Sequence, residues 1–347
     1  MRQALLRRRG RPHGALRPWA LGPLTGTPRH GRQDTTAKGV VMRGRGHVVL
    51  SAVLVTIWAA VAAAATSDGP LPVYDIVTGN EVEHAVTGGE TLEQIARRFG
   101  VRPQVVANFN RMSAPEPLRS GQRLRVSNRR IVPAHVIDGL VINAAELKLY
   151  WVRGGTVATE FPVAMGRQSW ETPNGQYTIV GRRRDPVWHV PPSIQREMRQ
   201  KGQTVKERVP AGPDNPLGKF WLQLSLPGYG IHGTNAPWSV GRFSTHGCVR
   251  LRPKDIEWLY KNIPDGTTVD IVNEPVKIAR VNDRILLEAH ARSPKRGAPS
   301  ADAVMERLRA SEIGPLIDQE AAQRAVRNAL GVAVDVTSPH AGDLAGR

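Results

Sequence analysis

The chain has 347 residues, a formal net charge of +18 and a single cysteine, Cys248. This length is enough for two or three domains, each with its own core. More than half of the net charge lies in residues 1–46, where ten Arg and one Lys face a single acid. We expect no nucleic-acid partner, because no zinc-finger pattern or aromatic-basic RNA motif accompanies this charge. A lone thiol also excludes an intramolecular disulfide and a thiolate metal cage.

An apolar stretch follows this basic segment. Val48 to Ala65 is almost wholly apolar, comes after two arginines and ends in an alanine run with an A-x-A site. This pattern is typical of a secretory signal peptide, which we assign to residues 47–65. The stretch is also near the lower length limit for a membrane span, so an uncleaved anchor is the alternative. Residues 1–46 are expected to be disordered, unless the true start of the chain is Met42.

A small domain is predicted after a Pro/Gly-rich linker at residues 66–82. In residues 83–127 the pattern predicts a strand, two helices and a second strand. Thr91 can cap the first helix, whose apolar residues share one face and which ends at Gly100. The second helix begins near Pro103.

The residues of this segment match those of a known module: Val86, Gly89-Glu90-Thr91-Leu92, Ile95-Ala96, Phe99-Gly100, Asn110, Leu118, Gly121-Gln122 and Leu124. On these residues the segment resembles a LysM module. The resemblance implies a βααβ fold that binds glycans containing N-acetylglucosamine, such as the strands of peptidoglycan. The alternative is a helical hairpin without a ligand, since the same apolar residues would form its core and a fold does not guarantee a function.

From residue 134 the pattern changes to strands. Apolar runs broken by Gly154-Gly155 predict a hairpin, and Pro173 with Asn174-Gly175 predicts a turn. A later strand, from Lys219 to Leu226, leads towards His232. Between these strands, Asp185 to Gly218 is long and rich in proline. Because an extended loop of this length in a compact domain is usually functional, we expect a lid or binding loop.

Cys248 is surrounded by residues that suit catalysis. Attack of a thiol on an amide or ester carbonyl needs a thiolate, a base, oxyanion donors and a binding pocket. In an extended chain His246 and Cys248 would lie about 7 Å apart on the same side, so direct pairing needs a bend that Gly247 permits. His232 ends a different strand, which is a more natural way to bring an imidazole over a thiol. Arg250 can face the same cleft and hold a carboxylate through a bidentate pair.

Spacing alone leaves three interpretations of this region open. In the first, the cysteine is a nucleophile. In the second, the cysteine and the two histidines belong to a packed loop without chemistry. In the third they form a His₂Cys metal site, although catalytic zinc usually has a better spaced third ligand.

A wider set of residues favours the interpretation of Cys248 as a nucleophile. Ile231-His-Gly-Thr-Asn235 and Ser244-Thr-His-Gly-Cys-Val-Arg250 are accompanied by Gly166, Thr172-Pro-Asn-Gly175, Pro186-Val-Trp188, Val190-Pro-Pro-Ser-Ile194 and Gly212-Pro-Asp-Asn-Pro-Leu-Gly218. On these residues the chain resembles the YkuD family of L,D-transpeptidases, in its ErfK/YbiS branch of Gram-negative bacteria. The resemblance covers residues 134–273 and implies a mostly β, sandwich-like catalytic domain with its active site under a loop.

The resemblance also implies roles for single residues. Cys248 is the nucleophile, and His232 is the general base, oriented by the backbone carbonyl at position 233. His246 and Gly247 help to form the oxyanion hole. No metal or organic cofactor is implied. Substrate contacts are implied for Arg250, Thr234 and Asn235.

The implied reaction is acyl transfer on peptidoglycan. Cys248 attacks the carbonyl of meso-diaminopimelate at position three of a tetrapeptide stem and releases the terminal D-Ala. If the acceptor amine belongs to another stem, a 3→3 cross-link forms; if it belongs to a lysine of an outer-membrane lipoprotein, that protein is anchored to the wall. With water as the acceptor, the same cysteine makes a carboxypeptidase or endopeptidase. A peptidoglycan-binding protein with an inactive catalytic fold is the alternative from another class, and the intact histidines and cysteine speak against it.

Residues 274–347 form a C-terminal extension. An extended segment at 274–290 resembles one seen in this branch, and two helical patterns follow at 301–310 and 316–330. Their alanine-rich faces are expected to pack on the domain or on a partner. The whole chain is thus predicted to be mainly β, with a LysM domain before the catalytic domain and a C-terminal α-helical tail. The signal sequence and the resemblance together imply a periplasmic protein, with an inner-membrane anchor as the alternative.

Overall fold

The computed structural model describes residues 70–113, 117–134, 136–291 and 300–341. The basic extension at 1–46 and the predicted signal or anchor at 47–65 therefore lie outside the described residues. Within the part of the chain that is described, no helix is both long and apolar enough to cross a membrane.

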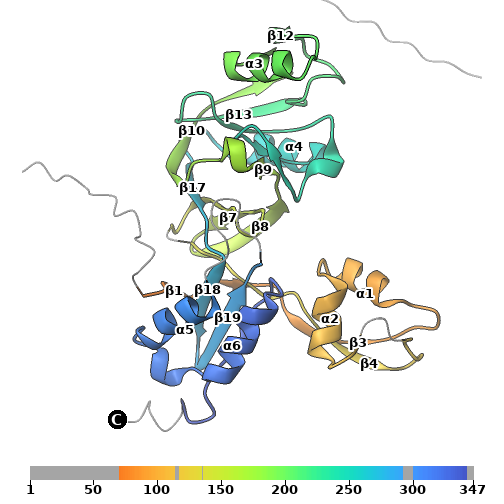
Figure 1. Ribbon diagram of the computed structural model, residues 1–347, viewed down its shortest axis with the longest axis vertical. Coiled ribbons are helices and arrows are strands. Elements are labelled where there is room, and N and C mark those ends of the chain that lie inside the picture. The colour runs from red at the N-terminus through yellow and green to blue at the C-terminus, as the bar shows by residue number, and fades with distance from the viewer. Residues whose placement is uncertain (1–69, 114–116, 135, 292–299, 342–347) are drawn as a thin grey trace, which may run out of the picture. The chain divides into compact units, whose positions relative to one another are not determined.

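The small domain has the predicted order of strand, two helices and strand (Figure 1). Helix α1 begins after Thr91 in a capping box, because the Thr91 hydroxyl accepts from the Gln94 N–H and the Gln94 side chain accepts from the Thr91 N–H. Leu92, Ile95 and Ala96 are buried on one face of α1, as the spacing predicted. The elements are β3 (Glu81–Ala85), α1 (Leu92–Arg98), α2 (Pro103–Phe109) and β4 (Arg123–Ser127), with β3 antiparallel to β4.

An eight-stranded sheet forms the middle of the described chain. Its strand order is β16-β14-β13-β10-β17-β6-β7-β8, and the β7–β8 hairpin turns at Gly154-Gly155 as predicted. The largest apolar core lies between this sheet and helix α4, where Ile256 and Leu259 are fully buried. The elements are β6 (Gly139–Asn143), β7 (Lys148–Arg153), β8 (Thr156–Pro162), β10 (Gly175–Arg184), β13 (Phe220–Leu224), β14 (Gly230–His232), β16 (Val249–Arg250), α4 (Pro253–Asn262) and β17 (Thr268–Val272).

The proline-rich segment at residues 185–218 is a flap with its own small core. It was predicted as an extended loop, but it contains helix α3 (Pro192–Gln200) and the antiparallel pair of β11 (Trp188–His189) and β12 (Arg208–Val209). Val190, Ile194 and Val209 are buried together. The buried Asn215 side chain donates to the Pro186 carbonyl at 2.8 Å, which ties the two ends of the flap to each other.

The C-terminal extension is a second sheet covered by helices. Strands β18 and β19 form a hairpin, and helices α5 and α6 pack on it (Figure 1). Both helices were predicted, whereas the pairing of β1 and β20 with this hairpin was not. The elements are β1 (Val73–Tyr74), β18 (Val276–Val281), β19 (Arg284–Ala289), α5 (Ala301–Arg309), α6 (Gln319–Asn328) and β20 (Val334–Asp335), in the sheet order β1-β18-β19-β20.

The described chain as a whole is a mixed α/β structure. The prediction of a mainly β chain is confirmed in part, because the middle region is built on one large curled sheet. The helix pair α1–α2 and the helices α5 and α6 were part of that prediction. The expected sandwich-like catalytic domain is not found, because its main strands pair into a single eight-stranded sheet. The remaining short strands are β2 (Val77–Thr78) with β5 (Arg130–Ile131), and β9 (Met165–Gly166) with β15 (Phe243–Thr245).

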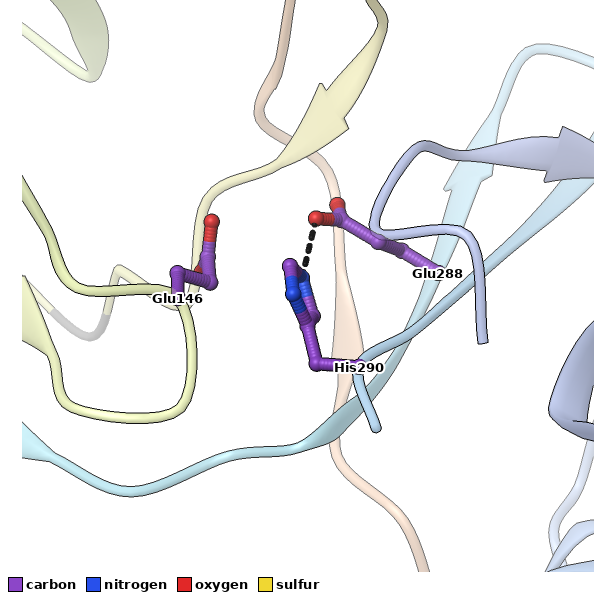
Figure 2. Close-up of side chains that lie close together, drawn as sticks. All are labelled: Glu146, Glu288 and His290. Atoms are coloured by element: carbon purple, nitrogen blue, oxygen red, sulfur yellow. Dashed lines mark hydrogen bonds and ion pairs between the residues drawn. The ribbon is translucent and has the colours of Figure 1, made fainter. Parts of the chain in front are cut away.

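A buried ionic network joins the β6–β7 turn to the β18–β19 hairpin. The Lys277 ammonium lies 2.6 Å from the Glu146 carboxylate and 3.1 Å from the Glu288 carboxylate, and each of these side chains is at most 1% exposed. Tyr150 donates to Glu146, and His290 lies 2.6 Å from Glu288 (Figure 2). Burial alone would raise the pKa of Glu288, but Lys277 and His290 hold this pKa well below its ordinary value. Glu288 is therefore ionised at neutral pH.

Replacing Lys277 with methionine is expected to lower the free energy of unfolding by about 3–5 kcal/mol, because two buried carboxylates would lose the ammonium that they share. The stabilisation that involves Glu288 is present above its unfolded pKa and is lost as the pH falls, since its folded pKa is depressed. Urea denaturation measures the change. The control is Arg324→Ala, which removes an exposed pair with Glu320 and should change stability by less than about 0.5 kcal/mol. Equal losses in the two variants would contradict a structural role for the network.

Candidate functional site

Two short parallel strands bring Cys248 and His232 to the same edge of the large sheet. Strand β14 pairs in parallel with β16, and His232 is the register partner of Arg250. Cys248 directly precedes β16, so it lies beside the beginning of β14. His232 thus lies on a different strand from the cysteine turn, which is the arrangement that the sequence favoured.

The ring of His232 is held from two sides. Trp221 is its register partner on β13, and the two rings stack at 5.7 Å with an interplanar angle of 20°. Gly230 makes this possible, because a Cβ at that position would lie only 2.4 Å from the Trp221 ring. His232 Nδ1 donates to the Gly233 carbonyl at 2.6 Å, the hydrogen bond that the family resemblance implied. With the proton on Nδ1, the lone pair of the neutral ring is on Nε2.

A tight bend at Gly247 separates His246 from Cys248. Its φ of 106° lies in the region that only glycine adopts easily, and a Cβ there would lie 2.7 Å from the Tyr229 ring. The Gly247 carbonyl accepts from the Thr172 hydroxyl at 2.8 Å. Its N–H donates to the Thr245 hydroxyl oxygen at 3.2 Å. The expected bend is therefore present, and the Gly247 amide already has a partner within the turn.

Cys248 faces a cavity of about 320 Å³. His232, His246 and Arg250 line the same cavity, so the structure brings four of the predicted site residues together. The other two predicted substrate contacts, Thr234 and Asn235, line a second cavity of about 460 Å³ instead. The flap supplies much of the wall of the Cys248 cavity, through Pro186, Val187, Trp188, His189, Pro191, Ile194, Pro216 and Leu217.

Burial controls the protonation of both reactive groups. It raises the pKa of the Cys248 thiol to about 11, against the opposing effects of a Gly230 backbone hydrogen bond and the Arg250 charge. Burial, with Arg250 as the second cause, lowers the pKa of His232 to about 4. At neutral pH the pair is therefore a neutral thiol and a neutral imidazole, because a low-dielectric site disfavours the charged forms. His232 can accept a proton, but the thiolate forms only as that proton leaves.

Arg250 has an incomplete set of partners in the described structure. One of its terminal nitrogens donates to the Ser239 hydroxyl at 3.0 Å. Its buried Nε has no hydrogen-bond partner among the described residues. An unmatched buried donor costs free energy. A ligand with a hydrogen-bond acceptor would therefore bind favourably at Arg250.

The sequence interpretation missed the partners of His246. The carboxylate of Glu197, on helix α3 of the flap, lies 2.8 Å from His246 Nε2, and Arg167 lies 3.0 Å from the same nitrogen. Because this segment was predicted as an extended loop, neither helix α3 nor the role of Glu197 was recognised. Two signals were available, since proline is favoured at the first turn of a helix and Glu197 with Lys201 has the i,i+4 spacing of a helical ion pair.

Within the described residues, one group of side chains has the spacing of metal ligands. Glu146, Glu288 and His290 offer ligand atoms that all lie within 4.8 Å of one another (Figure 2). The Lys277 ammonium already lies between the two carboxylates, and its positive charge opposes a metal ion at the same place. Cys248 with the two histidines does not form such a group in the described structure.

Comparisons with known families and proteins match both predicted domains. Residues 138–271 match the YkuD family, described as the L,D-transpeptidase catalytic domain, and residues 84–127 match the LysM domain. The chain is 37% identical to the probable L,D-transpeptidase ErfK/SrfK of Salmonella typhimurium over 210 residues, which are 58% of this chain and 67% of that protein.

Two further comparisons concern one relative and one solved structure. The ErfK/SrfK protein of Escherichia coli K12, also a probable L,D-transpeptidase, is 35% identical over 229 residues, which are 63% of this chain and 74% of that protein. A crystal structure of an L,D-transpeptidase from Mycobacterium tuberculosis is similar with a TM-score of 0.30 and 16% identity, over 58% of this chain and 94% of that chain.

Proposed function

The chain belongs to the YkuD family of L,D-transpeptidases, and we propose that it is a cysteine-dependent transpeptidase of peptidoglycan with Cys248 as its nucleophile. The main support is that Cys248 and His232 line one cavity while the Gly233 carbonyl fixes the tautomer of His232. A neutral imidazole held in this way offers its Nε2 lone pair to the thiol proton.

The proposed reaction has two transfers. His232 Nε2 takes the thiol proton as the sulfur attacks the diaminopimelate carbonyl at position three of a tetrapeptide stem. The bond to the terminal D-Ala then breaks, and its amine leaves with the proton from His232. The resulting thioester on Cys248 is attacked by an acceptor amine, whose proton passes through His232 back to the sulfur. The amide product leaves and the neutral pair is restored.

Other residues of the site are proposed to bind the substrate or its charge. We assign oxyanion stabilisation to the turn of His246 and Gly247, which adjoins the reacting sulfur. In this role the Gly247 N–H would exchange the Thr245 hydroxyl for the substrate oxygen. Arg250 is proposed to hold a substrate carboxylate, which is supported by its unmatched Nε beside the cavity. Thr234 and Asn235 are proposed to contact a more distant part of the substrate, because they line the second cavity.

The two domains are proposed to act on the same polymer. Residues 83–127 would bind the glycan strands, while residues 134–273 act on the stem peptides. A binding module linked to a catalytic domain raises the effective concentration of stems at the active site. The apolar pattern at 47–65 supports export to the periplasm, either as a free protein or with a retained inner-membrane anchor.

An amine is favoured over water as the acceptor in this proposal. Apolar flap residues, among them Trp188 and Ile194, line the cavity over Cys248. Such a wall limits the access of water to a thioester, which protects it until an amine arrives. The acceptor amine belongs either to a second stem or to a lysine of an outer-membrane lipoprotein.

Incubation of the purified protein with tetrapeptide muropeptides tests the proposal. We expect release of D-Ala and formation of 3→3 cross-linked dimers, identified by mass. A lysine-ended lipoprotein peptide in a parallel reaction should give an adduct if that lysine is the acceptor, and bare tripeptide would reveal hydrolysis. Protein alkylated at its single cysteine is the control. Unchanged tetrapeptide in every reaction would rule out the proposed activity.

A further inference from the structure

Two short parallel strands place Arg167 and His246 next to each other. Strand β9 pairs in parallel with β15, and the Arg167 N–H donates to the Thr245 carbonyl at 3.1 Å. Arg167 and His246 are the first residues after these strands, so their side chains emerge together. The Trp170 ring packs edge-on against the imidazole, with the ring centroids 5.2 Å apart.

The flap places Glu197 against both of these side chains. Its carboxylate accepts from one Arg167 nitrogen at 2.7 and 2.6 Å, and it lies 2.8 Å from His246 Nε2. Glu197 also pairs with Lys201 one turn later on α3. A second helix, α4, has the same i,i+4 pair in Glu257 and Lys261. The Glu257 side chain is 46% exposed, whereas that of Glu197, which also contacts Arg167 and His246, is 17% exposed.

The partners of His246 fix the position of its proton. A carboxylate only accepts, so the 2.8 Å contact requires a hydrogen on His246 Nε2. The nearby Arg167 nitrogen directs its hydrogens to the two oxygens of Glu197 and does not need Nε2 as an acceptor. His246 is therefore held in one tautomer and one orientation, directly before the Gly247 bend and Cys248.

We infer that Glu197 is a positioning residue, which couples closure of the flap to the geometry of the cysteine turn through its contact with His246. This inference rests on the proposed transpeptidase function. With the flap closed, Glu197 orients the imidazole, and the flap residues cover the Cys248 cavity. When α3 moves away, His246 loses its acceptor, so the turn is fully ordered only when the cavity is covered. Acyl transfer is thereby restricted to the state that excludes water.

The charges around His246 predict how removal of Glu197 changes the pKa of His246. Burial and the charges of Arg167 and Lys201 lower the pKa of His246, whereas the hydrogen bond and charge of Glu197 raise it. Loss of the carboxylate should therefore lower this pKa further. The ring is neutral at pH 7.5 with or without Glu197, so any loss of rate at that pH reports orientation and tautomer rather than charge.

A matched pair of variants tests the inference. Glu197→Ala and Lys261→Ala each break one Glu–Lys helix pair, but only the first removes a contact with His246. We expect Glu197→Ala to slow acyl-enzyme formation with the tetrapeptide substrate by roughly 10- to 100-fold, as loss of an orienting partner does elsewhere. Lys261→Ala should stay within about twofold of the wild-type rate. Glu197→Gln, which retains an acceptor oxygen, should form the acyl-enzyme at a rate between those of the two alanine variants. Intact-mass measurement of the acyl-enzyme gives the rates.

Nitrogen-15 NMR of labelled histidines gives a readout that does not depend on turnover. The wild-type His246 signal, assigned by its loss in His246→Asn, should report Nε2–H and a pKa below the ordinary range. In Glu197→Ala the Nε2–H population and the pKa should both decrease. An unchanged tautomer and pKa, or equal rates for the two alanine variants, overturns the inference. If the wild type forms no acyl-enzyme, the proposed function fails instead, and the NMR comparison still decides whether Glu197 orients His246.

Discussion

Cys248→Ala is expected to lower acyl transfer to the detection limit, a loss of about 10⁶-fold by analogy with other enzymes that lose their nucleophile. Without the sulfur no thioester forms, so the D-Ala bond of the stem cannot be exchanged for another amide. The chain has no second cysteine that could take its place. Intact mass should show no acyl-enzyme after incubation with tetrapeptide muropeptides, and the products should contain neither dimer nor tripeptide.

Two measurements separate this effect from general damage to the loop. Cys248→Ala should sediment with insoluble peptidoglycan as the wild type does, because glycan binding is proposed for residues 83–127. Ser244→Ala removes only a long 3.5 Å bond to the Ser239 carbonyl in the same loop and should keep most of the activity. Transfer by Cys248→Ala at more than a few per cent of the wild-type rate would show that another group is the nucleophile.

His232→Ala is expected to give the second largest effect, a loss of about 10²- to 10⁴-fold in the rate of acylation. In the wild type the rate should fall as the pH decreases through about 4, because the protonated imidazole no longer accepts the thiol proton. Alkylation of Cys248 by iodoacetamide should rise towards pH 11 without a plateau near neutrality, because the thiol is not ionised by an ion pair. His232→Ala should lack the acid limb of the acylation profile.

His246→Asn provides the comparison that identifies the base. Both histidines line the cavity, but His246 Nε2 is engaged with Glu197, whereas the Nδ1 bond of His232 leaves its Nε2 as the basic nitrogen. We therefore expect the smaller loss in His246→Asn and an unchanged acid limb. The base would have to be reassigned if His246→Asn removed that limb and His232→Ala retained it.

Local signals predicted much of the secondary structure. The Thr91 cap and the Gly154-Gly155 hairpin both depend on contacts within a few residues, which short sequence patterns encode. The flap shows where prediction from local sequence patterns fails. Its prolines were interpreted as a sign of extended chain, although proline at the start of α3 is compatible with a helix. The short β1 and β20 were missed because two-residue strands carry too little pattern to be recognised.

The order of residues alone determined that one cysteine stands in a His-Gly-Cys turn, that a second histidine ends an earlier strand, and that two known domains follow one another. These features depend on composition, spacing and motif, which are properties of the chain itself. Only the tertiary structure decided that Thr234 and Asn235 line a different cavity from Cys248. It also decided that His246 contacts Glu197, 49 residues away in the chain, and that burial keeps Cys248 and His232 neutral. The physical reason is that long-range packing and the exclusion of water arise between distant segments, and no local pattern specifies them.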